Sequence, residues 1–171
     1  MELFGTKGYD QTTVAEIAAR AGLTERTFFR HFADKREVLF GGAHMLQDAL
    51  VTAMESAPAS AAPIDQVAAG LAAAGDVFLD RDYSRQRQVV IAAHAELRER
   101  ELIKMASLSA AFADCLRRRG VSEPAATLSA DAGVAVFKVA FERWIDQDNE
   151  RPFRDLVTES LAELKVVAAG G

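Results

Sequence analysis

The chain has 171 residues, of which 50% are hydrophobic and 26% are charged, and its formal net charge is −5. A chain of this length can bury a sizeable core, and with only four prolines it favours an all-α fold. No run of about eighteen uninterrupted apolar residues occurs, and the N-terminus lacks the features of a secretory signal. The single cysteine, Cys115, cannot form an internal disulfide, which fits a reducing cytoplasm.

Residues 1–7 are expected to form the remnant of a helix, and residues 12–32 predict two short helices with a tight turn between them. Thr13 followed by Glu16 is a capping box, which marks a helix start. Apolar residues then recur at helical spacing on one face, at Val14, Ile17, Ala18 and Ala21. Gly22 occupies the left-handed position that ends a helix, and Thr24 is a new N-cap.

The second of these helices predicts two different faces. Phe28 and Phe32 lie one turn apart and are expected on the buried side. The remaining residues point elsewhere: Glu25, Arg26, Thr27, Phe29, Arg30 and His31. A short helix that presents donors and an aromatic ring, braced by another helix, suits the DNA major groove. The alternative is a helical hairpin inside a bundle with solvated arginines, and spacing alone leaves both readings open.

The net negative charge does not oppose DNA binding, because it lies outside this segment. Six basic residues balance six acidic residues through Phe40, so the remainder of the chain is the acidic part. Affinity for phosphate depends on a local basic patch. Arg26, Arg30, His31 and Lys35 are expected to supply it.

A long gapless pattern from about Leu3 to Leu39 resembles the N-terminal domain of TetR-type repressors. The matching residues are Gly8-Tyr9-Asp10-Gln11-Thr12-Thr13-Val14, Ile17-Ala18, Ala21-Gly22-Leu23-Thr24, Thr27-Phe28-Phe29-Arg30-His31-Phe32, Lys35 and Leu39. The resemblance implies a three-helix DNA-binding domain over residues 1–40, whose first helix we expect to continue upstream of Met1. It also implies a helical effector-binding and dimerisation domain over residues 41–171. Phe29 departs from the tyrosine that is common at this position in the family.

The remaining helices are expected to form an antiparallel bundle. Asp34 and Glu37 form another capping box, which opens a long helix through Met54. Residues 57–63 predict a loop, and one apolar face runs from Ile64 to Phe78. Residues 80–84 predict a polar turn, followed by helices over residues 85–95 and 97–119, the second stopped by Gly120 and broadly apolar. Two last helices are expected, from about Glu123 to Asp146 and from Phe153 onward.

Motifs that carry enzymatic or metal chemistry are absent from the sequence. It contains no HExxH, no P-loop, no GxGxxG and no CxxC, and its histidines fall on separate predicted helices. We therefore expect no enzyme, no cofactor and no metal. An enzyme built in the bundle stays an alternative that turnover of a bound ligand would reveal.

Three sets of site residues follow. The expected DNA surface consists of Thr13, Arg26, Thr27, Phe29, Arg30, His31 and Lys35. Of these, Thr13 and Lys35 are expected to contact the phosphate backbone of the DNA. The expected ligand pocket lies between the bundle and the long helix from Asp34 through Met54, which connects the two domains; it involves His94, Met105, Phe112 and Phe137. The alternative is that the last three of these only fill the core.

The third set is a dimer interface on a second apolar stripe of the helix from about Glu123 to Asp146. Its residues are Leu128, Ala132, Ala135 and Val139, with Gly133 alongside to allow close approach of a partner. Alternatively, this stripe packs on the chain's own final helix and leaves a monomer.

The function that the sequence favours is ligand-responsive regulation of transcription. We expect a repressor that binds a palindromic operator as a homodimer and that a small-molecule effector releases. The alternative is a helical small-molecule-binding or scaffolding protein with a non-functional helix-turn-helix. The sequence leaves open the operator, the effector, the regulated genes and the choice between repression and activation.

Overall fold

The structure is a computed structural model that describes residues 1–77 and 80–170, and all regular elements in these ranges are helices. The N-terminal helices are α1 (Glu2–Lys7), α2 (Val14–Arg20), α3 (Glu25–His31) and α4 (Glu37–Phe40). They are followed by α5 (Ala43–Ser56), α6 (Pro63–Ala72), α7 (Ala74–Val77) and α8 (Arg81–Ala93). The last helices are α9 (Ala95–Arg118), α10 (Glu123–Ile145) and α11 (Phe153–Ala168). The expected all-α fold is confirmed.

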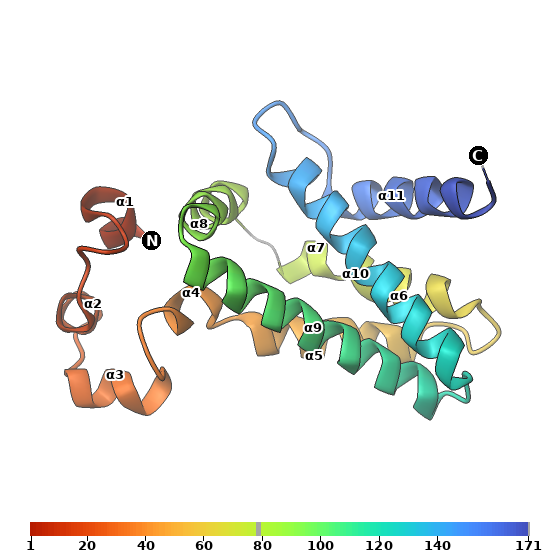
Figure 1. Cartoon of the computed structure of the whole chain (residues 1–171), viewed down its shortest axis with the longest axis horizontal. Helices are drawn as coiled ribbons and strands as arrows, with labels where there is room; N and C mark the ends of the chain where they lie inside the picture. The colour runs from red at the N-terminus through yellow and green to blue at the C-terminus, as the bar shows by residue number, and fades with distance from the viewer. Residues whose placement is uncertain (78–79, 171) are drawn as a thin grey trace.

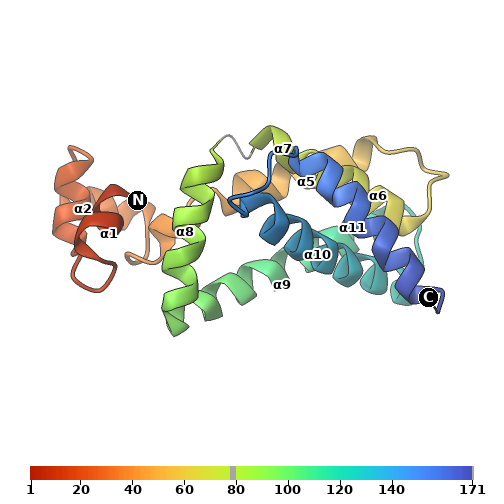
Figure 2. The same ribbon diagram turned by 90° about the horizontal axis from the view of Figure 1, so that it is seen from above.

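The helices are arranged in two groups along an elongated molecule (Figure 1). Helices α1–α3 form a small unit at one end, and most of the later helices pack together at the other end. Helix α8 stands between the two groups when the chain is seen from above (Figure 2). Helices α1–α3 and the bundle of later helices are thus spatially distinct.

Helix α10 is the centre of the bundle, because it packs against α6, α8, α9 and α11. Its buried side meets the most deeply buried side chains of the neighbouring helices, among them Val67, Phe112 and Leu116. The only tryptophan of the chain, Trp144, lies in this core against Phe141 and Phe153. Cys115 is also fully buried there, where it packs as a small apolar residue.

A second, smaller apolar cluster attaches the N-terminal unit to the rest of the chain. It combines buried residues of the first nine positions with residues of α4, α8 and α9: Phe4, Tyr9, Leu39, Phe40, Ile91 and Leu97. This cluster shares none of its residues with the bundle core. The two groups of helices therefore have separate apolar cores.

Two glycines let α6 approach its neighbours closely. A Cβ atom on Gly133 of α10 would lie 2.3 Å from Cγ1 of Val67 on α6. A Cβ atom on Gly70 of α6 would lie 2.8 Å from the carbonyl oxygen of Leu50 on α5. Gly133 is thus used for packing inside the chain, which corrects its expected place at the dimer interface.

Several predicted helix boundaries are wrong. The long helix expected from Asp34 to Met54 is interrupted at Gly41 and Gly42, because paired glycines have a low helix propensity and add no side-chain contacts to hold a helix. The helix expected from Ile64 to Phe78 ends at Ala72 and restarts at Ala74, and Phe78 lies outside the described residues.

The polar turn expected at residues 80–84 is in fact the start of α8. The Asp80 carboxylate accepts a hydrogen bond of 2.8 Å from the backbone N–H of Tyr83 and so caps this helix. Helix α9 is also less buried than expected. Leu102 and Ile103 are exposed in its N-terminal half, and the buried residues lie mainly in its C-terminal half.

Helix α10 is long and apolar enough to span a membrane by length and composition, with a mean hydropathy of 1.2 over its most apolar 18 residues. One third of these 18 residues is buried in the structure, and the core helix of a bundle can have the same length and composition. The apolar residues of α10 lie on two faces. One face is buried in the bundle, and the other is the stripe with Leu128 and Val139, whose side chains are 69% and 44% exposed. The second stripe therefore does not pack on α11 within this chain.

Candidate nucleic-acid interface

Helix α2 begins with a complete capping box. The Thr13 hydroxyl accepts a hydrogen bond from the Glu16 N–H, and the Glu16 carboxylate accepts one of 2.9 Å from the Thr13 N–H. Lys7 of α1 forms an ion pair with the same carboxylate. The bond from Lys7, followed by those from Thr13, lowers the pKa of Glu16 to about 2. Thr13 remains exposed at the start of the helix.

The turn between α2 and α3 is a Schellman motif. Gly22 has a φ of +68°, and its N–H donates to the Ala19 carbonyl at 3.1 Å. The Leu23 N–H reaches the Ala18 carbonyl at 2.8 Å. Thr24 then caps α3 by accepting a hydrogen bond of 3.2 Å from the Thr27 N–H. The predicted helix-turn-helix is therefore confirmed at each of its boundaries.

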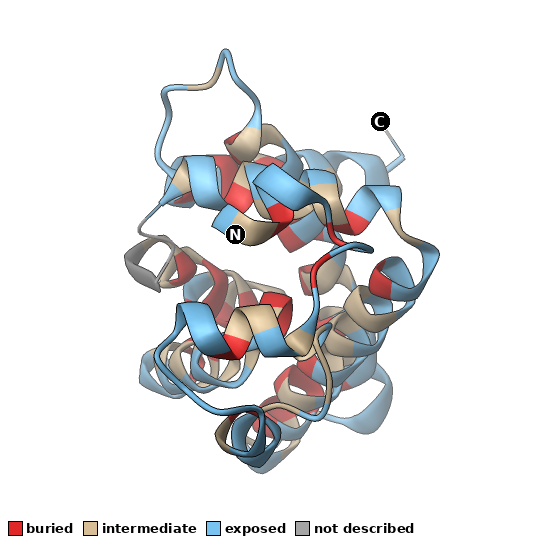
Figure 3. Cartoon of the chain, turned by 90° about the vertical axis from the view of Figure 1, so that its left-hand side faces the viewer, coloured by how far each residue is buried: buried red, intermediate tan, exposed pale blue. Residues whose placement is uncertain are grey.

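Helix α3 has one anchored side and one exposed side. Phe28 is 2% exposed, and its ring centroid lies 5.2 Å from that of Phe32. The adjacent Phe29 is 54% exposed, although it is a large apolar residue. Arg26, Arg30 and His31 are exposed as well. Seen from this end of the molecule, exposed and half-buried residues make up most of the nearest helices, and α1, α2 and α3 have one buried residue each (Figure 3).

Lys35 is held inside the unit rather than extended into solvent. Its ammonium group lies within 2.9 to 3.4 Å of three carbonyl oxygens, those of Tyr9, Asp10 and Thr12. These carbonyls belong to the turn that leads into α2. Lys35 therefore braces this turn from the segment that follows α3.

The N-terminal unit is also fixed to the junction of α8 and α9. The Tyr9 hydroxyl donates a hydrogen bond of 2.9 Å to Glu96, and the Tyr9 ring lies 4.8 Å from the His94 ring. Burial, followed by this bond to Glu96, raises the pKa of Tyr9 well above its usual value. Nδ1 of His94 lies 2.8 Å from the carbonyl oxygen of Val90, so the imidazole is oriented by its own helix.

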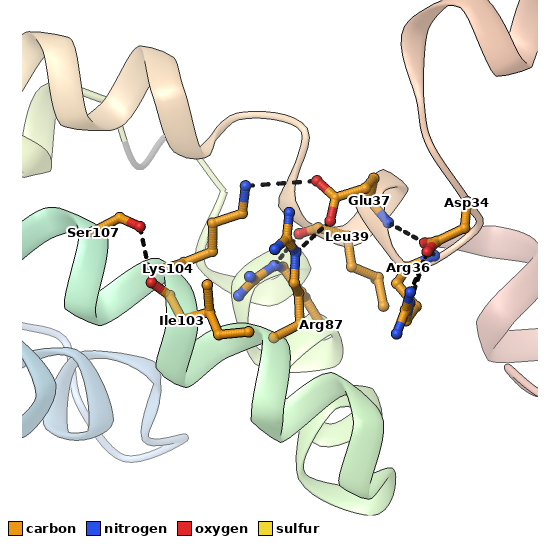
Figure 4. Close-up of polar contacts among 9 residues, drawn as sticks. Asp34, Arg36, Glu37, Leu39, Arg87, Ile103, Lys104 and Ser107 are labelled. Carbon is orange, nitrogen blue, oxygen red and sulfur yellow. Dashed lines mark hydrogen bonds and ion pairs between the residues drawn. The ribbon is translucent and has the colours of Figure 1, made fainter.

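Only one of the two interactions of the capping box expected at Asp34 is present. The Asp34 carboxylate accepts hydrogen bonds from the N–H groups of Arg36 and Glu37. Glu37 does not return to the Asp34 backbone; it bonds Arg100 of α9 at 2.5 Å (Figure 4). Arg87 of α8 donates to the Leu39 carbonyl, also at 2.5 Å. Helix α4 is thereby tied to both α8 and α9.

The predicted ligand residues do not gather in one pocket. His94 lies beside Tyr9 at the junction, whereas Phe112 and Phe137 are buried in the bundle core. Met105 lines a cavity of about 70 Å³ between α5 and α9. The structure thus separates His94 from the other three.

The polar contacts at the junction were not predicted from the sequence. Glu37 and Arg100 are separated by 63 positions, and Tyr9 and Glu96 by 87. No local spacing signals such pairs.

Sequence comparisons agree with this geometry. The model of the family described as "Bacterial regulatory proteins, tetR family" matches residues 1–40. The model of the MftR C-terminal domain, of the TetR_C type, matches residues 61–169, more than half of the chain. The HTH-type transcriptional regulator TcmR of Streptomyces glaucescens is 42% identical over 64 residues, which are 37% of this chain and 28% of TcmR.

Solved structures with a similar fold cover nearly the whole chain. Thermus thermophilus FadR, a TetR-family repressor solved in complex with lauroyl-CoA, has a TM-score of 0.58 and 19% identity, over 96% of this chain and 89% of FadR. A putative TetR-family regulator from Mesorhizobium loti has a TM-score of 0.57 and 20% identity, over 98% of this chain and 90% of its own. With its helix-turn-helix unit and its C-terminal helical region both matched, the chain belongs to the TetR family of bacterial regulatory proteins.

Proposed function

We propose that this chain is a ligand-responsive repressor that acts in the cytoplasm and binds a palindromic operator as a homodimer. The observation that carries the proposal is the two-sided character of α3. Its inner face is anchored by Phe28, while Arg26, Phe29 and Arg30 are exposed beside one another on the same short helix. Exposed donors and an aromatic ring on a braced helix are what base edges in the major groove require.

The proposed DNA surface divides into reading and positioning contacts. Arg26 and Thr27 are assigned to base edges, and Phe29 to sugar or a thymine methyl group. Thr13, Arg30 and His31 are assigned to the phosphate backbone. Among the described residues, Arg26 has no ion-pair partner, so its guanidinium is available to a base.

Lys35 is assigned a different role from the phosphate contact that its sequence position suggests. An ammonium group has three N–H donors, and three carbonyl oxygens lie within reach of them here. We propose that Lys35 positions the start of α2 against DNA. This assignment separates it from the six other residues of the surface.

The proposed dimer uses the outer stripe of α10. Leu128, Ala135 and Val139 are exposed and Ala132 is half-buried, and they recur at helical spacing. Helix α11 adds Val166 and Val167, which are also exposed. An apolar surface of this kind supports pairing with the same helices of a second copy, which gives a two-fold, four-helix interface.

The effector site is proposed between the connecting helix and the bundle, where Met105 lines the cavity between α5 and α9. Helix α5 follows α4 after Gly41 and Gly42, and α4 packs against the N-terminal unit through the apolar cluster that contains Leu39, Phe4 and Tyr9. A ligand that binds better to a DNA-incompetent arrangement of these helices would shift the population away from the operator.

A selection from random duplex DNA tests the repressor proposal. The full chain is expected to enrich a palindrome whose half-sites are one helical turn apart, roughly 34–36 Å. The double variant Arg26→Ala, Arg30→Ala is the control; it is expected to lose the enrichment while keeping the helical circular dichroism of the parent. If the parent chain enriches no sequence at all, the proposed function is wrong.

A further inference from the structure

One carboxylate at the base of the helix-turn-helix unit is shared by two cations. Arg100 donates to Glu37 at 2.5 Å, and the Lys104 ammonium lies 3.5 Å from the other oxygen of the same carboxylate (Figure 4). The side chains of Glu37 and Lys104 are 19% and 14% exposed. The bond from Arg100, together with the nearby charge of Lys104, lowers the pKa of Glu37, so the carboxylate is ionised at neutral pH. This cluster links α4 to α9.

Lys104 has only a share of its carboxylate partner. Among the described residues, Glu37 is the one carboxylate within ion-pair distance of Lys104, and Glu37 also binds Arg100. Glu96 and Glu99 line a hollow beside Arg100 and do not line the cavity that Lys104 borders. The ammonium of Lys104 can therefore pair with a second anion on its cavity side.

Lys104 also lines the cavity between α5 and α9. The cavity has a volume of about 70 Å³, and the side chains of Leu46, Met105 and Leu108 form its apolar walls. Among the residues that the structure describes, no carboxylate lines it, and Lys104 is its one lysine or arginine. An apolar cavity of roughly 150 Å³ accepts a benzene ring, so a space of half that size suits a chain of a few carbons.

We propose that this cavity binds a short aliphatic carboxylate, whose carboxylate takes Lys104 from Glu37. The proposal rests on the proposed function, because it names the chemical class of the effector. The carbon chain occupies the space beside Met105 and Leu108, and the charge pairs with the ammonium. Glu37 then retains Arg100 but loses its second cation. Binding of the ligand thereby weakens the connection between α4 and α9.

Isothermal titration of the full chain, without DNA, tests this site with butanoate as the probe. Butanoate is expected to bind at least about tenfold more tightly than 1-butanol, which has the same chain length without the charge. Lys104→Met keeps the aliphatic stem and is expected to abolish the preference for the carboxylate. Lys165→Met is the matched control, because Lys165 also pairs with a carboxylate, that of Asp65, on a different surface.

The decisive variant is Glu37→Gln, which removes the competing charge and keeps the size of the side chain. It is expected to tighten butanoate binding several-fold, whereas a purely structural role of Glu37 predicts no gain. Equal affinities for butanoate and 1-butanol, or an unchanged affinity in Glu37→Gln, would overturn the proposal. The titration contains no DNA, so a negative titration would rule out the carboxylate site without ruling out operator binding. A negative DNA selection would likewise rule out the repressor proposal without affecting the titration result.

Discussion

The Lys35 ammonium lies 4.3 Å from the centroid of the Tyr9 ring and donates a hydrogen bond of 2.9 Å to the Tyr9 carbonyl oxygen. This contact spans the whole helix-turn-helix unit, because Tyr9 precedes α2 and Lys35 follows α3. The aromatic face and the carbonyl both favour a cation at this point. The geometry therefore makes Lys35 part of the framework that orients α2.

The first prediction concerns Lys35→Met. The variant keeps the aliphatic stem but removes the three donors, so the free energy of unfolding in urea is expected to fall by about 1–3 kcal/mol. The salt dependence of operator binding is expected to keep its slope, because no phosphate contact is lost. In Arg30→Ala, by comparison, the slope is expected to fall by about one. A similar decrease in the salt-dependence slope for Lys35→Met would show that Lys35 contacts a DNA phosphate after all.

Two neighbouring phenylalanines are expected to separate stability from recognition. Phe28→Ala removes a fully packed ring, and the free energy of unfolding is expected to fall by about 3–5 kcal/mol. Phe29→Ala alters a mostly exposed ring and is expected to change stability by less than about 0.5 kcal/mol. The same Phe29 variant is expected to weaken operator affinity about tenfold, measured by fluorescence anisotropy. Unchanged affinity in Phe29→Ala would remove this ring from the DNA surface.

A charged residue introduced into the outer stripe of α10 is expected to weaken the proposed dimer. Ala135→Glu places two like charges close to the two-fold axis and is expected to raise the dimer dissociation constant by about 100-fold or more. Sedimentation analysis measures this change, with Ala92→Glu on the exposed side of α8 as the control. A parent chain that is monomeric at tens of micromolar, roughly the usual loading concentration, would contradict the dimer directly.

Gly133 and Val67 are expected to be energetically coupled. Gly133→Ala directs a methyl group into Val67 and is expected to cost about 1–3 kcal/mol, although alanine is the better helix former. Val67→Ala creates the missing space, so the double variant is expected to be more stable than the sum of the two single effects. Urea unfolding of the four proteins gives the coupling energy. Additive effects would mean that α6 and α10 shift apart freely.

Acid is expected to weaken the start of α2 through Glu16. The pKa of Glu16 is about 2 in the folded chain and 4.5 in its ordinary state, so the unfolded chain takes up the proton first as the pH falls. The stabilisation by the ionised carboxylate is therefore complete above pH 4.5 and is lost between pH 4.5 and 2. The stability difference between the parent and Glu16→Gln is expected to vanish over this range. A difference that is independent of pH would contradict this assignment.

The helix-turn-helix unit was predictable because its signals are local. Thr13 with Glu16, Gly22, and Thr24 all act on backbone groups within a few residues, and each adopts the predicted conformation. The family resemblance rests on the same short segment. The exposed stripe of α10 could also be read from its spacing, since a second apolar face cannot turn inward together with the first.

The sequence could not predict whether a polar side chain bonds a nearby residue or one that is distant in the chain. Glu37 has the position of a capping residue, yet its carboxylate bonds Arg100, which the fold brings from 63 positions away. Lys35 likewise has the position of a phosphate contact but bonds carbonyl groups of a preceding turn. In both cases a local pattern names a suitable side chain, and tertiary packing supplies a stronger partner.

The single tryptophan makes the two apolar cores distinguishable by spectroscopy. Trp144 is buried among Phe141 and Phe153 in the bundle, while the N-terminal cluster contains Tyr9 and no tryptophan. Tryptophan emission therefore reports the bundle alone, whereas far-ultraviolet circular dichroism reports all helices. Two unfolding curves that fail to coincide would show the helix-turn-helix unit melting independently, without a label or an added probe.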